Sequence, residues 1–560
     1  MSRRRVTIER RSTAYPEPQP DENLAPFFEP IVDARRRRAH WRSVALWAAP
    51  LLLSGVLLEA AADLTAQVPV ETIQLDNGMR ILLVERPETT TIAAGWVVEV
   101  GSADEAPGKT GLSHLLEHLM FKGTRTVGTR DIEREMVLLD REDRLQSELR
   151  ELRSGLSEAA TKKRAKLEQR IADSEAQLRL LQAEARSQAL LGQFSLFYSR
   201  LGAVGLNAHT LRDLTFYYVT VPAEKLEAWF WLESDRMSEP VLREFYKELD
   251  VIHEERRLRI ESNPTGSADE QLKSEFWGRH PYAWDPQGAP EDLEGLTRES
   301  ARLFFRQHYA PERITAALVG AFDPEQVRGL AERYFGRIPP REASPRIRVP
   351  LPAPDDFAGG RTLTLECRCP SRVQVLYPSA AFGDADSCAL DVLAAVLNGR
   401  SGRLYRTMVL GRQIAFSASA QQNQLRQAGY FAFQAETKGS SRPEDLLTAW
   451  DQEVAKLKTE LVTAEELLRA KNRLTADSFR RLKEPASLLA QLLVYQGMGD
   501  WREINSWPRQ VLQVESEQVR AAARRYLEPG GRIVAFYRRT DGGDRPAVSG
   551  PQGIEGGAAP

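Results

Sequence analysis

Histidine and cysteine are both scarce in this chain. It has 7 histidines and 3 cysteines in 560 residues, and its formal net charge is −2. Three cysteines are too few for the disulfide framework of a small secreted domain, and we interpret Cys367, Cys369 and Cys388 as packing residues. A balanced charge gives no sign of a basic face for nucleic acid, so we expect no nucleic-acid partner.

The few histidines are also unevenly placed. Residues 361–540 contain none, whereas two stand four residues apart in the stretch His114-Leu-Leu-Glu-His118. On an α-helix these two imidazoles lie on one face and can converge on one metal ion, and Glu117 is close enough to reach a water on that metal. The order His-x-x-Glu-His is the inverzincin signature, and neutral imidazoles suit Zn²⁺. The pattern predicts one Zn²⁺ per chain, with Glu117 as the catalytic residue.

A catalytic zinc site needs a third protein ligand and an open position. The charged segment 244–262 is typical of a helix and contains several carboxylates. Glu248 and Glu255 are seven residues apart, which separates them by about 10.5 Å of helical rise on nearly one face. They therefore cannot both bind one metal ion. The spacing alone leaves open which of them is the ligand, or whether this helix is only a solvated, salt-bridged surface.

The N-terminal region has the pattern of a targeting segment. Residues 1–43 are polar and arginine-rich, so we expect a disordered basic segment. The apolar run Val44–Leu58 is followed by small residues, and we interpret 44–62 as a signal peptide or signal anchor. Arginines before the run place the N-terminus in the cytoplasm and the body outside, with membrane attachment through 44–58 if the run is not cleaved.

Residues 68–337 have the pattern of a folded α/β half. Apolar alternation flanks Asn77-Gly78, the strongest short signal for a β-hairpin. A buried strand is expected within 91–102, directly before the histidine motif. Residues 131–190 then interrupt this half with a charged tract that is almost free of aromatics. Its leucines recur at heptad spacing, so we expect an inserted antiparallel helical coiled-coil hairpin that buries its own apolar seam.

The remainder of the chain divides at a proline-dense stretch. We interpret residues 338–360 as a linker, 361–540 as a second folded half that binds no metal, and 541–560 as a disordered Gly/Pro-rich tail.

Several segments agree, in order, with one family. They are LDNGMRILLVE, GLSHLLEHLMFKGT, LNAHT, ESDRM, ELDVIHEERR, HPYAWDPQG, HYAPERITAALVGAFD and YFGRIP. On these segments the chain resembles the pitrilysin/insulinase family of zinc metallopeptidases, in the branch that includes mitochondrial processing peptidase and bacterial relatives. The match covers residues 72–540 outside the helical tract.

The resemblance implies an α+β fold in which two homologous α/β halves, each a sheet backed by helices, form a clam shell around peptides in extended conformation. In the family the distal zinc ligand is the second glutamate of a Glu-x₆-Glu pattern. This implies Glu255 as the ligand and Glu248 as the carboxylate that supports the site. The resemblance also implies Asn207 as a substrate-binding residue, whereas His209 replaces the usual aromatic and is not assigned as a ligand.

The activity that the resemblance implies is that of a zinc-dependent metalloendopeptidase. Zinc held by His114, His118 and Glu255 would acidify a bound water, and Glu117 would take its proton as the water attacks a peptide carbonyl. The expected substrate is a peptide or unfolded protein, and the expected location is the bacterial periplasm or cell envelope. The alternative is a non-catalytic, core-protein-like structural subunit, against which the intact histidine motif argues.

One departure from the family concerns the second half. Family members that complete their own active site carry an Arg and a Tyr seven residues apart after a segment like GRSGRLYRTMV. Here those positions hold Val409 and Phe416, whose side chains cannot donate a hydrogen bond. We therefore expect the chain to be the zinc-bearing subunit of a heterodimer, with a homologous partner that carries the Arg/Tyr pair.

Overall fold

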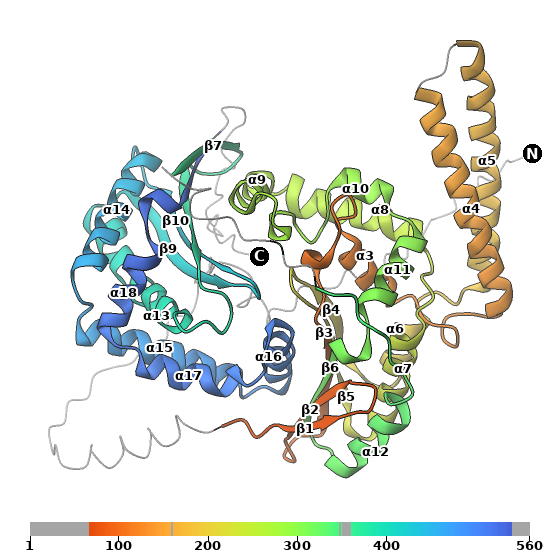
Figure 1. Ribbon diagram of the computed structural model, residues 1–560, viewed down its shortest axis with the longest axis horizontal. Helices are drawn as coiled ribbons and strands as arrows, with labels where there is room; N and C mark the ends of the chain where they lie inside the picture. The colour runs from red at the N-terminus through yellow and green to blue at the C-terminus, as the bar shows by residue number, and fades with distance from the viewer. Residues whose placement is uncertain (1–66, 158–160, 347–348, 350–359, 540–560) are drawn as a thin grey trace, which may run out of the picture. The chain divides into compact units, whose positions relative to one another are not determined.

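The computed structural model describes residues 67–157, 161–346, 349 and 360–539 (Figure 1). Within them the chain forms two β-sheets, each backed by helices, which confirms the expected α+β class. The segments 1–43, 44–62 and 541–560, and residues 350–359 of the expected linker, lie outside the described residues. In the described part of the chain, no helix is both long and apolar enough to cross a membrane.

The first sheet has six strands in the order β1-β2-β6-β3-β5-β4. Only the pair β2/β6 is parallel. The Asn77-Gly78 turn joins β1 to β2 as expected, and Gly78 has the left-handed φ of 90° that favours glycine there. The strands are β1 (Glu71–Gln74), β2 (Arg80–Glu85), β3 (Thr91–Val98), β4 (Val204–Thr210), β5 (Thr215–Pro222) and β6 (Ile314–Gly320).

Helices pack around this sheet, and one of them, α3, carries the histidine motif. The α-helices of this half are α3 (Leu112–Leu119), α4 (Ile132–Ser157), α5 (Thr161–Gln188), α6 (Gln193–Arg200), α7 (Leu226–Ser238), α8 (Phe245–Arg256), α9 (Gly266–Trp277), α10 (Pro290–Gly295), α11 (Arg298–His308) and α12 (Pro324–Tyr334). A π-helical turn, η3 (Arg257–Glu261), continues α8, and a short 3₁₀ turn, η4 (Pro281–Ala283), follows α9.

The second sheet has five strands in the order β7-β11-β8-β10-β9, with only β7/β11 parallel. Its strands are β7 (Arg361–Cys367), β8 (Arg372–Ser379), β9 (Ala415–Gln424), β10 (Gly429–Thr437) and β11 (Ile533–Arg539). Its helices are α13 (Ser387–Leu397), α14 (Pro443–Thr459), α15 (Ala464–Arg481), α16 (Pro485–Met498), α17 (Glu503–Gln513) and α18 (Ser516–Tyr526), with a π-helical turn η7 (Tyr405–Gly411) before β9.

The two sheets share one topology. The order β2-β6-β3-β5-β4 becomes β7-β11-β8-β10-β9 when each strand is replaced by the strand five places later. In both sheets the last strand of the half pairs in parallel with the first strand of this shared order. The edge strand β4 of the first half therefore corresponds to the edge strand β9 of the second, and β1 is an addition to the first.

Both faces of the first sheet are covered. One face contributes Trp96, together with residues of α3 and α7, to a large apolar core. Helix α16 from the second half packs on β3 and β6, and a Cβ added to Gly95 of β3 would lie only 2.9 Å from Leu493 Cδ1 of that helix. This double burial explains why β3 is a continuous apolar run rather than an alternating one.

Residues 131–190 form two helices that run antiparallel and side by side (Figure 1). Ion pairs join α4 and α5 at two positions along their length. Arg134 Nη2 lies 2.8 Å from Glu184, and Arg170 Nη2 lies 3.2 Å from Glu148. The expected helical hairpin is thus present, while its coiled-coil character stays a prediction.

The expectation that this hairpin buries only its own seam is wrong. Arg243 donates to both carboxylate oxygens of Glu135 in α4, at 2.7 and 3.0 Å. Arg298 donates to Glu142 at 2.6 Å and to Asp143 at 2.5 Å. Both arginines are almost fully buried, so the inner part of α4 supplies the countercharges for two buried cations of the body.

The interpretation of the cysteines as simple packing residues is also wrong for two of them. Cys367 at the end of β7 and Cys369 are joined by a disulfide, and only Cys388 is a free thiol among the described residues. All three are buried. Residues two apart in an extended segment point to the same side, which is how such close neighbours come to face one another.

We predict that the two parts of the hairpin differ in their importance for stability. Replacing 146–178 by a short Gly/Ser loop keeps Glu135, Glu142 and Asp143 and should change the melting temperature by only a few degrees. Replacing all of 131–190 strips Arg243 and Arg298 of their carboxylates, and each broken buried pair costs about 3–5 kcal/mol, a large part of a typical stability of about 5–15 kcal/mol. Calorimetry on both variants measures the two melting temperatures. Equal values would contradict the idea that the carboxylates of α4 stabilise the body.

Candidate metal centre

The helix that carries the histidine motif is fixed at its N-terminus by a buried carboxylate. Glu105 accepts the backbone N–H of Gly111 at 3.0 Å and that of Ser113 at 2.7 Å. These bonds satisfy donors that the first turn of α3 leaves unpaired. Burial raises the pKa of Glu105 to about 8 in spite of these two bonds. Gly111 has φ 85°, and a Cβ there would lie 2.6 Å from Leu293 Cδ2, so glycine is required where the chain enters the helix.

Helices α3 and α8 bring three candidate metal ligands together. His114 Nε2 lies 3.7 Å and His118 Nε2 lies 3.5 Å from Glu255 Oε2. One donor atom from each of the three residues lies within 4.8 Å of the others. A tetrahedral Zn²⁺ with ligand bonds of about 2.0–2.1 Å requires ligand atoms roughly 3.3–3.4 Å apart. These two separations are close to this requirement, and the remaining pair, His114 and His118, lies within 4.8 Å, so the donor set fits a zinc ion.

The protonation of the two histidines is set by different surroundings. Burial lowers the pKa of His114 well below its usual value, which favours the neutral imidazole that binds a metal. Burial also acts to lower the pKa of His118, but the hydrogen bond with Glu248 and the charges of Glu117 and Glu255 raise it overall. This concentration of carboxylates around His118 favours a cation at the centre.

Glu248 lies behind His118 rather than among the three candidate ligands. Its Oε2 is 3.4 Å from His118 Nδ1, the ring nitrogen that does not face Glu255, and its Oε1 is 2.7 Å from Lys122 Nζ. Burial alone would raise the pKa of Glu248, but the bond with His118 and the charge of Lys122 bring it below the usual value. An ionised carboxylate in this place orients the imidazole and makes it a better ligand.

Glu117 occupies the buried side of the same helix. Its Oε2 accepts a hydrogen bond of 2.5 Å from Thr210 Oγ1 on β4, and burial raises its pKa above the usual value for glutamate. Thr210 was not identified from the sequence. The only hint is the period of the strand, since Thr210 and the buried Ala208 share one face of β4.

Asn207 lies on the edge strand β4, opposite Tyr218 of β5. Its Oδ1 accepts the N–H of Ala208 at 2.9 Å. His209, on the same strand, has its Nε2 3.2 Å from the Tyr218 hydroxyl and is not one of the residues grouped as candidate ligands. Asn207 thus lies on the same strand as Thr210, which holds Glu117, and among the described residues no hydrogen bond joins it to the three candidate ligands.

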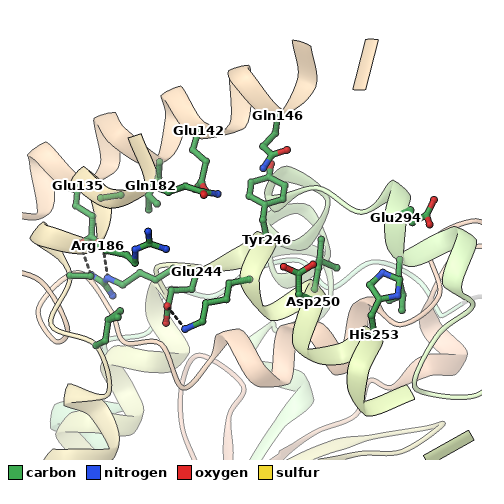
Figure 2. A pocket seen from close by; sticks show the side chains of 18 of the residues that line it. Glu135, Glu142, Gln146, Gln182, Arg186, Glu244, Tyr246, Asp250, His253 and Glu294 are labelled. Carbon is green, nitrogen blue, oxygen red and sulfur yellow. Dashed lines mark hydrogen bonds and ion pairs between the residues drawn. The ribbon is translucent and has the colours of Figure 1, made fainter. Parts of the chain in front are cut away.

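A separate cavity lies on the opposite side of α8, under the helical hairpin (Figure 2). Its volume is about 860 Å³. Tyr246, Asp250 and His253 of α8 line it, whereas the candidate ligand Glu255 does not. The cavity is therefore distinct from the metal centre, although both are built on the same helix.

Two family models match this chain. Residues 80–140 match the model described as Insulinase (Peptidase family M16), and residues 295–474 match the model described as Peptidase M16 inactive domain. The first segment contains His114, Glu117 and His118. The second contains none of the three candidate ligands.

Known proteins with similar sequences and structures agree with these matches. The chain is 24% identical over 498 residues to the zinc protease PqqE of Helicobacter pylori. The matched region covers 87% of this chain and 97% of that protein. The chain is 23% identical over 442 residues to the probable mitochondrial-processing peptidase subunit beta of Schizosaccharomyces pombe, covering 75% and 81%. The crystal structure of a protease from Helicobacter pylori superposes with a TM-score of 0.68 at 22% identity, over 84% of this chain and 100% of that one. At this identity the superposition shows a shared fold.

We predict that substitutions at His118, Glu255 and Glu248 weaken zinc binding to different extents. His118→Ala should abolish zinc binding and Glu255→Gln should weaken it strongly, because each removes a ligand. Glu248→Gln should weaken it by about 10-fold to 100-fold, because it only loosens the orientation of His118. Zinc content and chelator competition on the purified proteins measure all three. If Glu248→Gln lost the metal while Glu255→Gln kept it, the two roles would be reversed.

Proposed function

Because the chain carries domains of the peptidase M16 (insulinase/pitrilysin-like) family, we propose that it is a zinc-dependent metalloendopeptidase that hydrolyses peptides held in extended conformation. This proposal rests on one observation. His114, His118 and Glu255 place ligand atoms around one point, and the buried side chain of Glu117 belongs to the same short helix as the two histidines. Zn²⁺ is the ion we assign to this point, one per chain.

The residues of the chain have separate tasks in this proposal. When bound, Zn²⁺ supplies Lewis acidity and lowers the pKa of water. Glu117 takes the proton of the attacking water. Thr210 holds Oε2 of Glu117, so the carboxylate keeps one orientation during the transfer.

The edge strand β4 is the proposed place for the substrate. A strand at the edge of a sheet has backbone groups free on its outer side, and an extended peptide can add there as a further strand. Such a peptide would lie beside Asn207, whose side-chain amide is the proposed donor to a substrate carbonyl. It would also pass Thr210 and hence Glu117. The substrate class we propose is an unstructured peptide or unfolded protein.

A non-catalytic, core-protein-like subunit is the second candidate. The match of residues 295–474 to an inactive domain favours it for the end of the first half and for much of the second. That match begins after Glu255, however, so it does not extend to the ligands. We therefore keep catalysis as the proposed function of the first half. We place the protein in the bacterial periplasm or cell envelope, on the basis of the apolar run at 44–58 and the arginines that precede it.

We predict that Glu117→Gln keeps zinc and loses about 10²-fold to 10⁴-fold in peptidase rate, the range for loss of a general base. The rate is measured on an unstructured fluorogenic peptide, together with zinc content. Glu254→Gln serves as the matched control, since Glu254 is exposed on α8 and its one ion pair among the described residues is with Arg257. Full activity of Glu117→Gln would refute the assignment of the base.

The second half lacks polar groups at two positions where a complete site is expected to have them. Val409 in η7 is half-buried against the core of the second half, and Phe416 in the edge strand β9 is 63% exposed. Neither side chain can donate to a substrate carbonyl or to a developing oxyanion. We propose that a homologous subunit with the Arg/Tyr pair supplies these donors in a heterodimer.

We predict weak turnover for the isolated chain and a gain from Val409→Arg combined with Phe416→Tyr. Loss of one such donor costs about 10²-fold to 10³-fold in rate, so the double variant should raise partner-independent activity measurably. Its melting temperature should be recorded too, because Val409 is half-buried. Strong cleavage by the unmodified chain alone, as a monomer or homodimer, would contradict the need for a partner.

A further inference from the structure

Glu255 presents its two carboxylate oxygens to different neighbours. Oε2 faces the imidazoles of His114 and His118. Oε1 faces two N–H donors on the other side, Arg259 Nη2 at 2.8 Å and Gln287 Nε2 at 3.5 Å. The direction of the carboxylate therefore depends on the groups at Oε1 as well as on the imidazoles.

The two donors differ in their surroundings. The side chain of Arg259 is 66% exposed, and an exposed ion pair on a long side chain is weak and easily rearranged. Gln287 is only 6% exposed, and its Oε1 finds no hydrogen-bond partner among the described residues. The contact with Glu255 is the single side-chain hydrogen bond of Gln287 within the described chain. Since burying an amide is unfavourable without partners, this residue needs an explanation beyond packing.

The backbone beside Gln287 is fixed between the two helices that carry the ligands. A Cβ added to Gly288 would lie 2.6 Å from Gly111 Cα, so the loop touches the entry to α3 directly. On the other side, Arg256 of α8 donates to the carbonyl oxygen of Gly288 at 2.7 Å. Arg256 is itself held by both oxygens of Glu270 at 2.9 Å.

A further bond ties the same loop to α3. The N–H of Ala289 donates to Thr110 Oγ1 at 2.8 Å, one residue before Gly111. The segment 287–289 thus contacts both ligand-bearing helices and has little freedom relative to either. A side chain on this segment is well placed to set the direction of a ligand on α8.

We propose that Gln287 is a positioning residue for Glu255. Its amide N–H holds Oε1 and thereby turns Oε2 toward His114 and His118. Arg259 acts on the same oxygen from the solvent side and balances its charge. This inference rests on the proposed function, because it takes Glu255 to be a zinc ligand.

The test is the zinc affinity of Gln287→Met in the full chain, measured by competition with a chromophoric chelator. Methionine has a similar shape and no N–H. The dissociation constant should rise about 10-fold to 100-fold, as for other groups that orient metal ligands. If Gln287→Met does not fold, Gln287→Asn decides, because it keeps an amide but is one methylene too short to reach Glu255. Arg257→Gln is the matched control: it removes an exposed ion pair with Glu254 near the same ligand and should leave the affinity unchanged.

A second readout separates positioning from a general structural role. With Co²⁺ in place of Zn²⁺, the visible absorption reports ligand number and geometry. If Gln287 orients the carboxylate, the bands of Gln287→Met should change in intensity and position, whereas those of Arg257→Gln should match the wild type. Unchanged affinity and unchanged bands in the Gln287 variants would overturn the inference while leaving the zinc site intact. A wild-type chain that binds no zinc would refute the proposed function instead.

Discussion

The centre of this structure depends on a carboxylate held against two imidazoles, one buried and one half-buried. Glu255 Oε2 faces His114 and His118 from a different helix, and most of the nearby architecture serves to keep α3 and α8 at that separation. Glu105 fixes the start of α3. Gly111 and Gly288 allow two backbones to touch where any Cβ would intrude. A site of this kind tolerates little displacement, because metal–ligand bonds vary by only about 0.2 Å.

The repeated topology shows how one architecture supports two unequal halves. Strands β2 to β6 and β7 to β11 have the same order and the same single parallel pair. In the first half the helix after the second strand of the repeat, α3, carries the metal-binding pattern. The corresponding helix α13 of the second half is a buried apolar helix without histidine. The edge strands β4 and β9 correspond as well, yet β4 carries Asn207 and Thr210 whereas β9 presents Phe416.

The sequence predicts the parts of the site that depend on local periodicity. His114, Glu117 and His118 follow from the 3.6-residue period of a helix. Glu255 does not, because the contact between α3 and α8 is tertiary, and only the resemblance to a family selects it over Glu248. Thr210 and Gln287 escape prediction for the same reason. Their partners lie 93 and 32 residues away, and no spacing rule connects them.

The difference between local periodicity and tertiary contacts also explains the two wrong expectations, which concern the helical hairpin and the cysteines. Heptad leucines predict that two helices pair, and they do. They carry no information on Glu135 and Glu142, whose partners Arg243 and Arg298 stand more than a hundred residues later. The Cys367–Cys369 disulfide joins residues two apart, so a count of cysteines gives no guide to it.

The central claim is that α3 and α8 hold one zinc ion through two imidazoles and one carboxylate. Zinc X-ray absorption on the metal-loaded full chain measures this most directly. The account predicts only nitrogen and oxygen neighbours at about 2.0–2.1 Å, with the multiple-scattering pattern of two imidazoles, and loss of one imidazole contribution or of the metal in His118→Ala. A sulfur neighbour at about 2.3 Å, or an imidazole count that His118→Ala does not change, would contradict it.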